Sequence, residues 1–364
     1  MKELKDYKEE IHRCSKCGLC QAVCPVYLTT GNECTVCRGQ FVMLDGIIKG
    51  KLKLNKNINK YLDLCLKCGK CKDFCPSEID VVDILIAAKY MYFKHSLSGK
   101  IYKILESKLI FNTFFNSLKL CSSLFSKHKK SKPFHKKAVY FGGCISKLRP
   151  DINNYVIELL NKMEIEVVEI DFNCCGMPFL STGNLERFTE QLIENAEKLP
   201  DNIDCLITDC ASCEWIWKQY IKYADKPKIK DKLSKVNIRN LYELLIENNI
   251  QFTAKTPQKI TFHKPCHESA NIEKLLKNCN AIEYEQMDGY DECCGFAGFE
   301  HPAALSAIYK IMRLKRNNIK KTSANTVLTT CSGCLSCLNI ILFLSGKKIR
   351  SLTAFLKDNC KFRQ

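Results

Sequence analysis

The chain twice places two adjacent cysteines before a glycine, as CCGMP at 174–178 and as CCGFA at 293–297. Neighbouring cysteines rarely form a disulfide with each other, because an ordinary disulfide needs Cα atoms about 4.4–6.8 Å apart and a particular torsion. Two adjacent thiolates can instead point into one shared site. The chain has 25 cysteines among 364 residues, so its fold has to gather many thiols into a few places.

The cysteines stand in C-x2-C steps, which is typical of metal binding rather than of a disulfide framework. The N-terminal segment MKELKDYKEE has no apolar core, and the hydrophobic stretch 81–93 is interrupted by Asp83 and Lys89. We therefore expect neither a signal peptide nor a spanning helix, and we expect the protein to be cytoplasmic. In that compartment thiolate is the ligand that soft iron–sulfur chemistry prefers.

Two runs of four cysteines near the N-terminus share the spacing C-x2-C-x2-C-x3-C-P. This is the bacterial ferredoxin spacing, in which the fourth cysteine of each run binds the other cluster. We predict two [4Fe–4S] clusters, the first held by Cys14, Cys17, Cys20 and Cys75, and the second by Cys65, Cys68, Cys71 and Cys24. A structural zinc site is the alternative, and two intact copies of the motif disfavour it.

The chain divides into a helical part, a linker and an α/β part. Residues 1–95 carry ten cysteines, short helical patterns and few strand signals, which predicts an α-helical domain of the two-[4Fe–4S] ferredoxin type. Residues 96–137 contain an amphipathic run and then KHKKSKPFHKK, which predicts an amphipathic linker with a basic end. From 138 onward, short β-branched runs alternate with helical ones, as in an α/β domain.

The α/β part is duplicated. Cys144 corresponds to Cys266, Cys175 to Cys294 and Cys210 to Cys331, at offsets of 122, 119 and 121 residues, which indicates an internal repeat. We predict one cysteine-rich repeat at 138–255 and a second at 256–364. The predicted strands are 138–143, 164–170 and 205–209 in the first repeat, and 259–264, 281–285 and 325–330 in the second.

Each repeat carries five cysteines that we predict to bind metal. They are Cys144, Cys174, Cys175, Cys210 and Cys213 in the first repeat, and Cys266, Cys293, Cys294, Cys331 and Cys334 in the second. These cysteines stand at the carboxyl ends of predicted strands, the edge at which open α/β sheets bind ligands. Five thiolates are one more than a cubane needs, so each site suggests either an unusual cluster or an exchangeable ligand.

The repeated C…CCG…CxxC pattern resembles the cysteine-rich (CCG) domain of heterodisulfide reductase catalytic subunits and of the iron–sulfur subunits of glycolate oxidase and anaerobic glycerol-3-phosphate dehydrogenase. The order of motifs is most similar to the glycolate oxidase iron–sulfur subunit, over nearly the whole chain. The resemblance implies one or two further iron–sulfur clusters at the CCG repeats, of the noncubane kind found in heterodisulfide reductases. The 29 residues between Cys144 and Cys174 and the 26 between Cys266 and Cys293 are fewer than in that motif, which leaves the cluster type open.

The sequence has no dinucleotide-binding glycine loop, Walker A motif or nucleophile with a base, so we expect no catalytic residue and no activity from the chain alone. The resemblance implies a partner flavoprotein that carries FAD and oxidises a 2-hydroxy acid such as glycolate or D-lactate. This chain would pass the electrons toward quinone or another carrier. One alternative is a heterodisulfide-reductase-like subunit that reduces a disulfide at the CCG sites, and another is the anaerobic glycerol-3-phosphate dehydrogenase subunit.

Several features of the sequence allow two interpretations of their role. Cys34 and Cys37 form a further C-x2-C that either binds metal or packs, and His263 and His267 either tune a cluster or serve the structure. The formal charge of +17 either offsets cluster charge and attracts anionic lipid or an acidic partner, or serves solubility. The linker either lies on a membrane or packs between domains. No aromatic–basic recognition module accompanies the charge, so we expect no nucleic acid partner.

Overall fold

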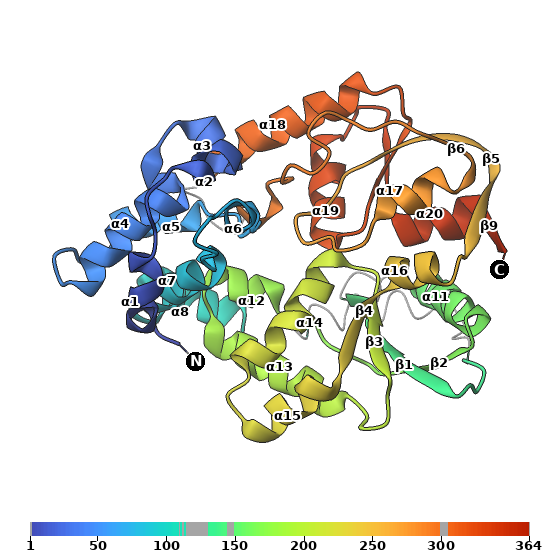
Figure 1. Cartoon of the computed structure of the whole chain (residues 1–364), viewed down its shortest axis with the longest axis horizontal. Coiled ribbons are helices and arrows are strands. Elements are labelled where there is room, and N and C mark those ends of the chain that lie inside the picture. Colours follow the sequence, from blue (N-terminus) through green and yellow to red (C-terminus); the bar gives the residue numbers. More distant parts are fainter. Residues whose placement is uncertain are drawn as a thin grey trace.

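The computed structural model describes residues 2–108, 110, 113, 130–143, 149–298 and 305–363. Its N-terminal part is helical, as predicted, and lies beside two α/β lobes (Figure 1). Leu44, Leu62 and Ile84 belong to a core of this part, against which the cysteine-bearing loops pack. Its helices are η1 (Leu4–Tyr7), α1 (Lys8–His12), α2 (Leu19–Val23), α3 (Pro25–Thr30), η2 (Glu33–Thr35), α4 (Cys37–Ile48), α5 (Lys56–Asp63), α6 (Lys70–Asp73), α7 (Val81–His95) and α8 (Leu97–Leu105).

The two lobes have the same strand order, which confirms the predicted duplicated α/β fold. The first lobe, residues 136–247, has the parallel order β2-β1-β3-β4, and the second lobe, residues 251–363, has β6-β5-β7-β8 with β9 antiparallel to β5. The strands are β1 (Lys136–Tyr140), β2 (Ile165–Val168), β3 (Cys205–Thr208), β4 (Asn237–Asn240), β5 (Gln251–Phe262), β6 (Asn280–Tyr284), β7 (Thr326–Thr329), β8 (Lys348–Ser351) and β9 (Cys360–Arg363).

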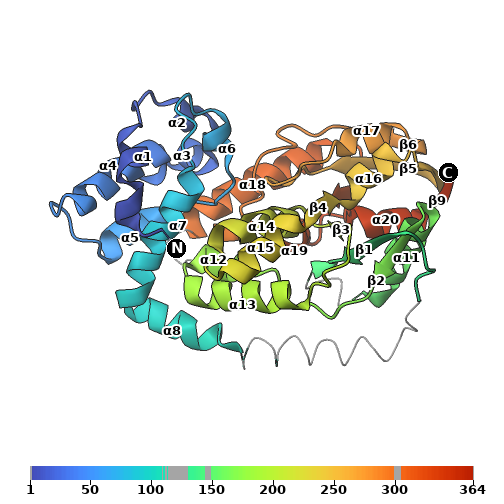
Figure 2. The same ribbon diagram turned by 60° about the horizontal axis from the view of Figure 1, so that its bottom comes forward.

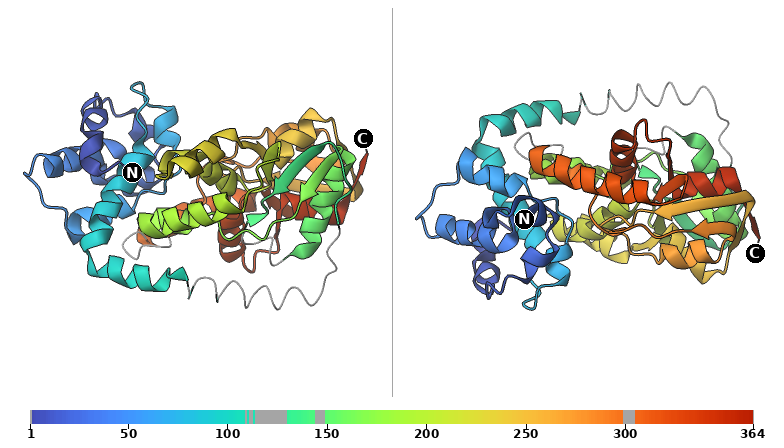
Figure 3. Two further views of the ribbon diagram at one scale, coloured as in Figure 1. Left: turned by 90° about the horizontal axis from the view of Figure 1, so that it is seen from below. Right: turned by 90° about the horizontal axis from the view of Figure 1, so that it is seen from above.

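Helices connect the strands and lie on both sides of the sheets in the two turned views (Figures 2 and 3). The first lobe has α11 (Pro150–Lys162), α12 (Met177–Thr182), α13 (Leu185–Lys198), α14 (Ala211–Tyr223), α15 (Pro227–Lys235) and α16 (Leu241–Glu247). The second lobe has α17 (Ile272–Lys277), η3 (Phe296–Gly298), α18 (Leu305–Lys321), α19 (Ser332–Ile341) and α20 (Leu352–Asn359). Of the helices in the described ranges, none is long and apolar enough to cross a membrane.

Successive side chains of the first sheet enter different cores. Ala138 and Ile207 face one core, and their neighbours Val139 and Leu206 face another, as the two-residue period of a strand requires when both faces are covered. The first of these cores is shared between the lobes, because it also contains Phe252 and other residues of the second lobe. The lobes are therefore held together by apolar packing.

The helical part is joined to both lobes near its cysteine loops. Val82 and Ile86 of α7 belong to the core of the first lobe, whereas Val26 and Leu66 pack with α18 and α19 of the second. Figure 1 shows α18 reaching from the second lobe to α3, and Lys310 Nζ donates to Thr29 O across that contact at 3.5 Å. Cys24 and Cys68 pack against the same core, so part of the cysteine motifs lies beside the second lobe.

Strand β5 is longer than the predicted strand 259–264 and runs across the proposed repeat boundary at 255/256. Its first half pairs with β9, and its register with β6 shifts between Thr253 and Gln258. That irregularity contains Pro257, which has no N–H to donate to a ladder. Residues 109, 111, 112 and 114–129 of the proposed linker 96–137 lie outside the described residues, and α8 belongs to its described part.

The shared core predicts a large effect of one truncation. Leu245 of α16 is fully buried in it, so Leu245→Ala should lower the free energy of unfolding by about 2–5 kcal/mol through lost burial and a cavity. Leu97→Ala is the control, because Leu97 is 75% exposed and its truncation should change the free energy by less than about 0.5 kcal/mol. Denaturant titration of both variants measures these changes in the free energy of unfolding. Equal losses would contradict a core shared between the lobes.

Candidate metal centres

The first predicted ligand set surrounds one cavity. Cys14, Cys17, Cys20 and Cys75 all line it, beside the start of α2. The loop that carries three of them turns through Lys16 at φ 57° and Gly18 at φ 88°, left-handed conformations that let consecutive thiols face one centre. Cys75 comes from the other motif, after α6, so the chain crosses between motifs as the ferredoxin spacing predicts.

The second predicted set surrounds a neighbouring cavity. Cys24, Cys65, Cys68 and Cys71 line it, and its loop repeats the first turn, with Lys67 at φ 55° and Gly69 at φ 78°. Burial raises the pKa of Cys68 well above its ordinary value and that of Cys24 to about 12. Metal binding at this site would therefore have to displace protons. Soft thiols of this number and placement fit a cubane cluster.

Cys37 stands between these two cavities and lines both. Its thiol is hydrogen-bonded to Cys20 of the first set and to Cys71 of the second, and this bond lowers the pKa of Cys20 to about 6 and also lowers that of Cys71. Cys34, its partner in the C-x2-C step, lines neither cavity. The C-x2-C spacing of this pair did not reveal its role from the sequence alone. Only the fold shows that Cys37, at the start of α4, lies beside both ferredoxin-type motifs.

The second lobe gathers its five predicted cysteines at one edge of its sheet. Cys266 follows β5, Cys331 follows β7, and Cys334 lies in the first turn of α19. The Sγ atoms of Cys294 and Cys334 are 3.3 Å apart, and hydrogen bonds connect Cys266 with Cys293 and Cys331 with Cys334. Gly295 turns at φ 89° after the pair. The adjacent cysteines thus both enter one site.

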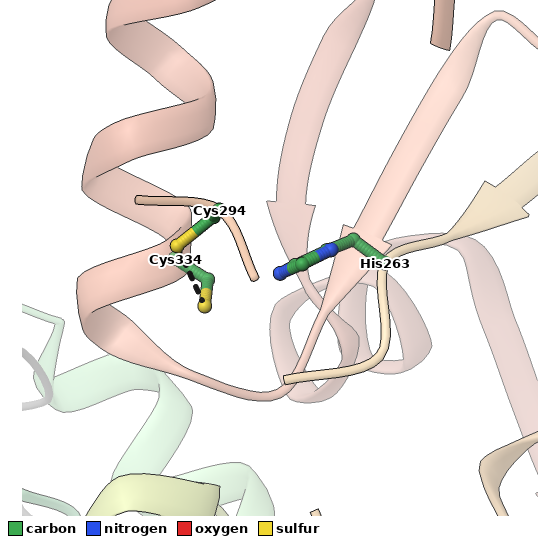
Figure 4. A group of neighbouring side chains, drawn as sticks. All are labelled: His263, Cys294 and Cys334. Atoms are coloured by element: carbon green, nitrogen blue, oxygen red, sulfur yellow. Dashed lines mark hydrogen bonds between the residues drawn. The ribbon is translucent and has the colours of Figure 1, made fainter. Parts of the chain in front are cut away.

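Two basic side chains also reach the second-lobe site. His263 is fully buried, and its ring lies close to the Sγ atoms of Cys294 and Cys334 (Figure 4). Burial and the positive charge of Lys315 lower the pKa of His263 well below its usual value, so the imidazole is neutral. Lys315 of α18 is itself buried and interacts with Cys266, Cys293 and Cys294. No sequence pattern had marked this lysine.

The first lobe brings together four of its five predicted cysteines. Cys174, Cys175, Cys210 and Cys213 are buried, and hydrogen bonds connect the thiol of Cys213 with those of Cys175 and Cys210. Cys144 lies outside the described residues. Gly143 before it approaches the same site, because a Cβ there would be 3.1 Å from Cys213 Sγ.

The second-lobe site joins the sites on either side of it. Cys68 of the helical part interacts electrostatically with Cys266 and Cys293, and an ion pair between Lys70 Nζ and Asp291 Oδ2, 3.0 Å apart, holds this contact.

On the other side, a hydrogen bond connects Cys331 with Cys210 of the first lobe. Ala211 N–H donates to Thr330 O at 3.0 Å, and Ser212 Oγ lies 3.1 Å from Cys331 Sγ. The four thiol sites therefore follow one another without interruption, from the first ferredoxin-type site to the first lobe.

His267, the other histidine of the motif, serves a different contact. Its ring stacks on Trp215, with centroids 4.5 Å apart, and its Nε2 lies 3.1 Å from the carbonyl oxygen of Lys67. His267 thus connects the second lobe to the loop of the second ferredoxin-type site. The sequence could not separate this role from that of His263.

Two domain families match the chain. Residues 10–79 match the 4Fe-4S dicluster domain, and residues 138–217 and 260–339 each match the cysteine-rich domain, CCG. These domains indicate that the chain binds iron–sulfur clusters.

Relatives along nearly the whole chain have the same character. The chain is 23% identical to the probable glycolate oxidase iron-sulfur subunit of Bacillus subtilis, over 92% of this chain and 91% of that protein. It is 23% identical to the glycolate oxidase iron-sulfur subunit of Escherichia coli, over 89% of this chain and 88% of that protein. It is 24% identical to a subunit of the fumarate reductase (CoM/CoB) of Methanothermobacter marburgensis, over 91% of this chain and 68% of that protein. The resemblance drawn from the cysteine motifs is confirmed.

The position of Cys37 predicts that it tunes clusters without binding them. In Cys37→Ala the single S–H that can donate to the sulfur of Cys20 or of Cys71 is lost, and since such a bond stabilises the more negative reduced state, the reduction potential of the cluster that accepts it should fall. Cys34→Ala is the control and should leave both potentials unchanged. Potentiometric titration followed by EPR measures them. Loss of about four iron atoms per chain in Cys37→Ala would show instead that Cys37 is a ligand.

Proposed function

We propose that this chain, which belongs to the iron–sulfur proteins that combine a 4Fe-4S dicluster domain with CCG domains, is the electron-transfer subunit of a flavin-dependent 2-hydroxy-acid dehydrogenase. The observation that carries the proposal is the uninterrupted series of four thiol sites. Cys37 lines both ferredoxin-type cavities, Cys68 packs in one core with Cys266 and Cys293, and Ser212 Oγ of the first lobe lies 3.1 Å from Cys331 Sγ of the second. Isolated structural metal sites would not need these contacts.

The residues define a route through the chain. Cys14, Cys17, Cys20 and Cys75 would hold one [4Fe–4S] cluster, and Cys24, Cys65, Cys68 and Cys71 the next. The five cysteines of the second lobe and those of the first would hold up to two further clusters. Such clusters take up and release single electrons. A partner flavoprotein containing FAD would remove two electrons and two protons from the hydroxy acid, giving the oxo acid, and the series would carry the electrons singly toward quinone or another carrier.

The names of the relatives guide the choice of substrate. Two of them are glycolate oxidase iron-sulfur subunits, and shorter matches are lactate utilization proteins A. Glycolate and D-lactate are therefore the substrates that we propose for the complex, with glycerol 3-phosphate as the alternative from the anaerobic dehydrogenase.

A cavity between the lobes favours disulfide reduction as the second candidate. Cys210 and Cys331, one from each lobe, line it together with Arg149 and Arg350. A disulfide that bound there would contact a thiol of both CCG sites, and two electrons and two protons would convert it to two thiols. The guanidinium groups could hold an anionic substrate, although Asp151 and Asp358 already pair with them.

Anaerobic isolation of the chain from its own cells tests the main proposal. We expect a co-purifying flavoprotein and reduction of a quinone when glycolate or D-lactate is added. Cys331→Ser should reduce this rate to that of the flavoprotein alone, because Cys331 stands at the junction of the lobes. Cys205→Ser is the matched control, since Cys205 lies on β3 outside every site.

The other outcomes of this experiment distinguish the two alternative functions. Iron-rich protein without flavin, which reduces a disulfide when given reduced carrier, would replace the main proposal by the second candidate. Activity with glycerol 3-phosphate alone would assign the complex to the anaerobic dehydrogenase.

We also propose that the complex is cytoplasmic and binds the inner face of the cytoplasmic membrane through α8. This helix lies at the edge of the helical part in Figures 2 and 3. Leu97, Ile101, Ile104 and Leu105 occupy one of its faces, at spacings of four, three and one residues, and all are exposed. An apolar stripe on a chain with a formal charge of +17 suits the interface of an anionic bilayer.

Vesicle binding measures this contact. Ile104→Glu should weaken binding to vesicles containing phosphatidylserine by about tenfold or more, because burying an isoleucine contributes about 1.5–3 kcal/mol. Phe343→Glu, at a second exposed site beyond α19, is the control and should bind as the unaltered protein does. Co-sedimentation with phosphatidylserine vesicles and with neutral vesicles gives both affinities. Unchanged binding of Ile104→Glu would exclude α8 as the contact.

A further inference from the structure

The two CCG sites differ at one equivalent position. The offset of 122 residues that relates Cys144 to Cys266 also relates Phe141 to His263. Each residue follows the central strand of its sheet, and each is held there by the same backbone bond, Phe141 N–H to Ile207 O at 2.8 Å and His263 N–H to Leu328 O at 2.9 Å. Equivalent positions of the two sheets therefore carry a phenyl ring in the first lobe and an imidazole in the second.

In the second lobe the imidazole has the geometry of a ligand. One of its ring nitrogens and the Sγ atoms of Cys294 and Cys334 all lie within 4.8 Å of one another. Figure 4 shows the ring extending from the end of β5 toward these two thiols. The side chain is 0% exposed, and neither ring nitrogen completes a hydrogen bond within the described part of the chain, although the backbone of Tyr290 lies beside the ring.

The backbone of Tyr290 can serve one ring nitrogen at most, so the other has left water without gaining a partner among the described residues, which is unfavourable. A bond to a metal would compensate for this loss. Imidazole nitrogen and thiolate are both accepted ligands of iron–sulfur groups, so the donors present are chemically compatible.

In the first lobe the equivalent side chain cannot bind metal. The ring of Phe141 packs against Phe172 and Trp217, with centroids 5.3 Å away in each case. This aromatic group fills the position that His263 occupies in the other lobe.

We propose that His263 is a ligand of the iron–sulfur group of the second lobe, together with Cys294 and Cys334, and that the first lobe binds its group through thiolates alone. One of the remaining cysteines, Cys266, Cys293 or Cys331, completes a set of four ligands, so the imidazole takes the place of a thiolate. A neutral nitrogen in place of a thiolate leaves the group less negative, which raises its reduction potential. The group of the second lobe would then have the higher reduction potential of the two CCG groups. It would lie beside Cys68 of the helical part.

The proposal rests on the presence of an iron–sulfur group in the second lobe, which is part of the function proposed above. The experiment uses the full chain, purified anaerobically with its iron, and with histidine labelled with 15N. Pulsed EPR at the potential where each cluster becomes paramagnetic should detect a 15N coupling on one of them. This measurement needs no variant.

Two variants assign the coupling to a residue. His263→Phe copies the first lobe, and it should abolish the coupling and lower the potential of the same cluster. His267→Gln is the matched control, because His267 is even nearer to Cys266 in sequence but contacts Trp215 and Lys67 instead, and it should retain the coupling and the potential.

Three results would overturn the proposal. Iron in the second lobe without any 15N coupling, in a protein that still accepts electrons from the flavoprotein, would remove His263 as a ligand and leave the proposed function intact. A coupling that persists in His263→Phe would assign the nitrogen to another histidine. A second lobe without iron would contradict the proposed function as well, and iron analysis separates this case from the first.

Discussion

The repulsion among thiolates brought into a dry interior is the constraint on which the structure depends. Burial raises the pKa of Cys65 and Cys68, and hydrogen bonds with neighbouring thiols raise that of Cys213, so the thiolate form is disfavoured at these three positions. A bound iron–sulfur group reverses this preference, because the metal charge stabilises the thiolates that it binds. Stability of the cysteine edges is therefore coupled to cluster binding. The lysines around them, such as Lys70 and Lys315, offset part of the remaining negative charge.

Parallel sheets explain how one chain assembles so many thiols. The carboxyl ends of parallel strands lie at the same edge, so the cysteines that follow β3, β5 and β7 converge although they are far apart in sequence. The edges of the two lobes then meet, with Ala211 N–H donating to Thr330 O at their junction. A duplication of one unit thus creates two sites and also the contact between them.

The sequence predicted those features that depend on spacing and period. The helical N-terminal part, the duplicated α/β fold and the family resemblance followed from the cysteine steps and from alternating β-branched runs. Strands β4 and β8 were not predicted from the sequence. Their sequences, NIRN and KIRS, are short and polar and lack the apolar run that marks a buried strand. The bridging place of Cys37 and the burial of Lys315 depend on tertiary packing, which no local pattern encodes.

Duplication with divergence gives the two lobes different chemistry on the same backbone. The first lobe surrounds its cysteines with Phe141, Phe172 and Trp217, an apolar wall that offers no charge to the site. The second lobe presents His263 and Lys315, which favour a more reduced or more anionic state of whatever binds there. Because the second lobe also lies between the helical part and the first lobe, a raised potential in its proposed group would hold electrons at the middle of the proposed series. The fold places the sites, whereas a few side chains beside the cysteines distinguish one site from the other.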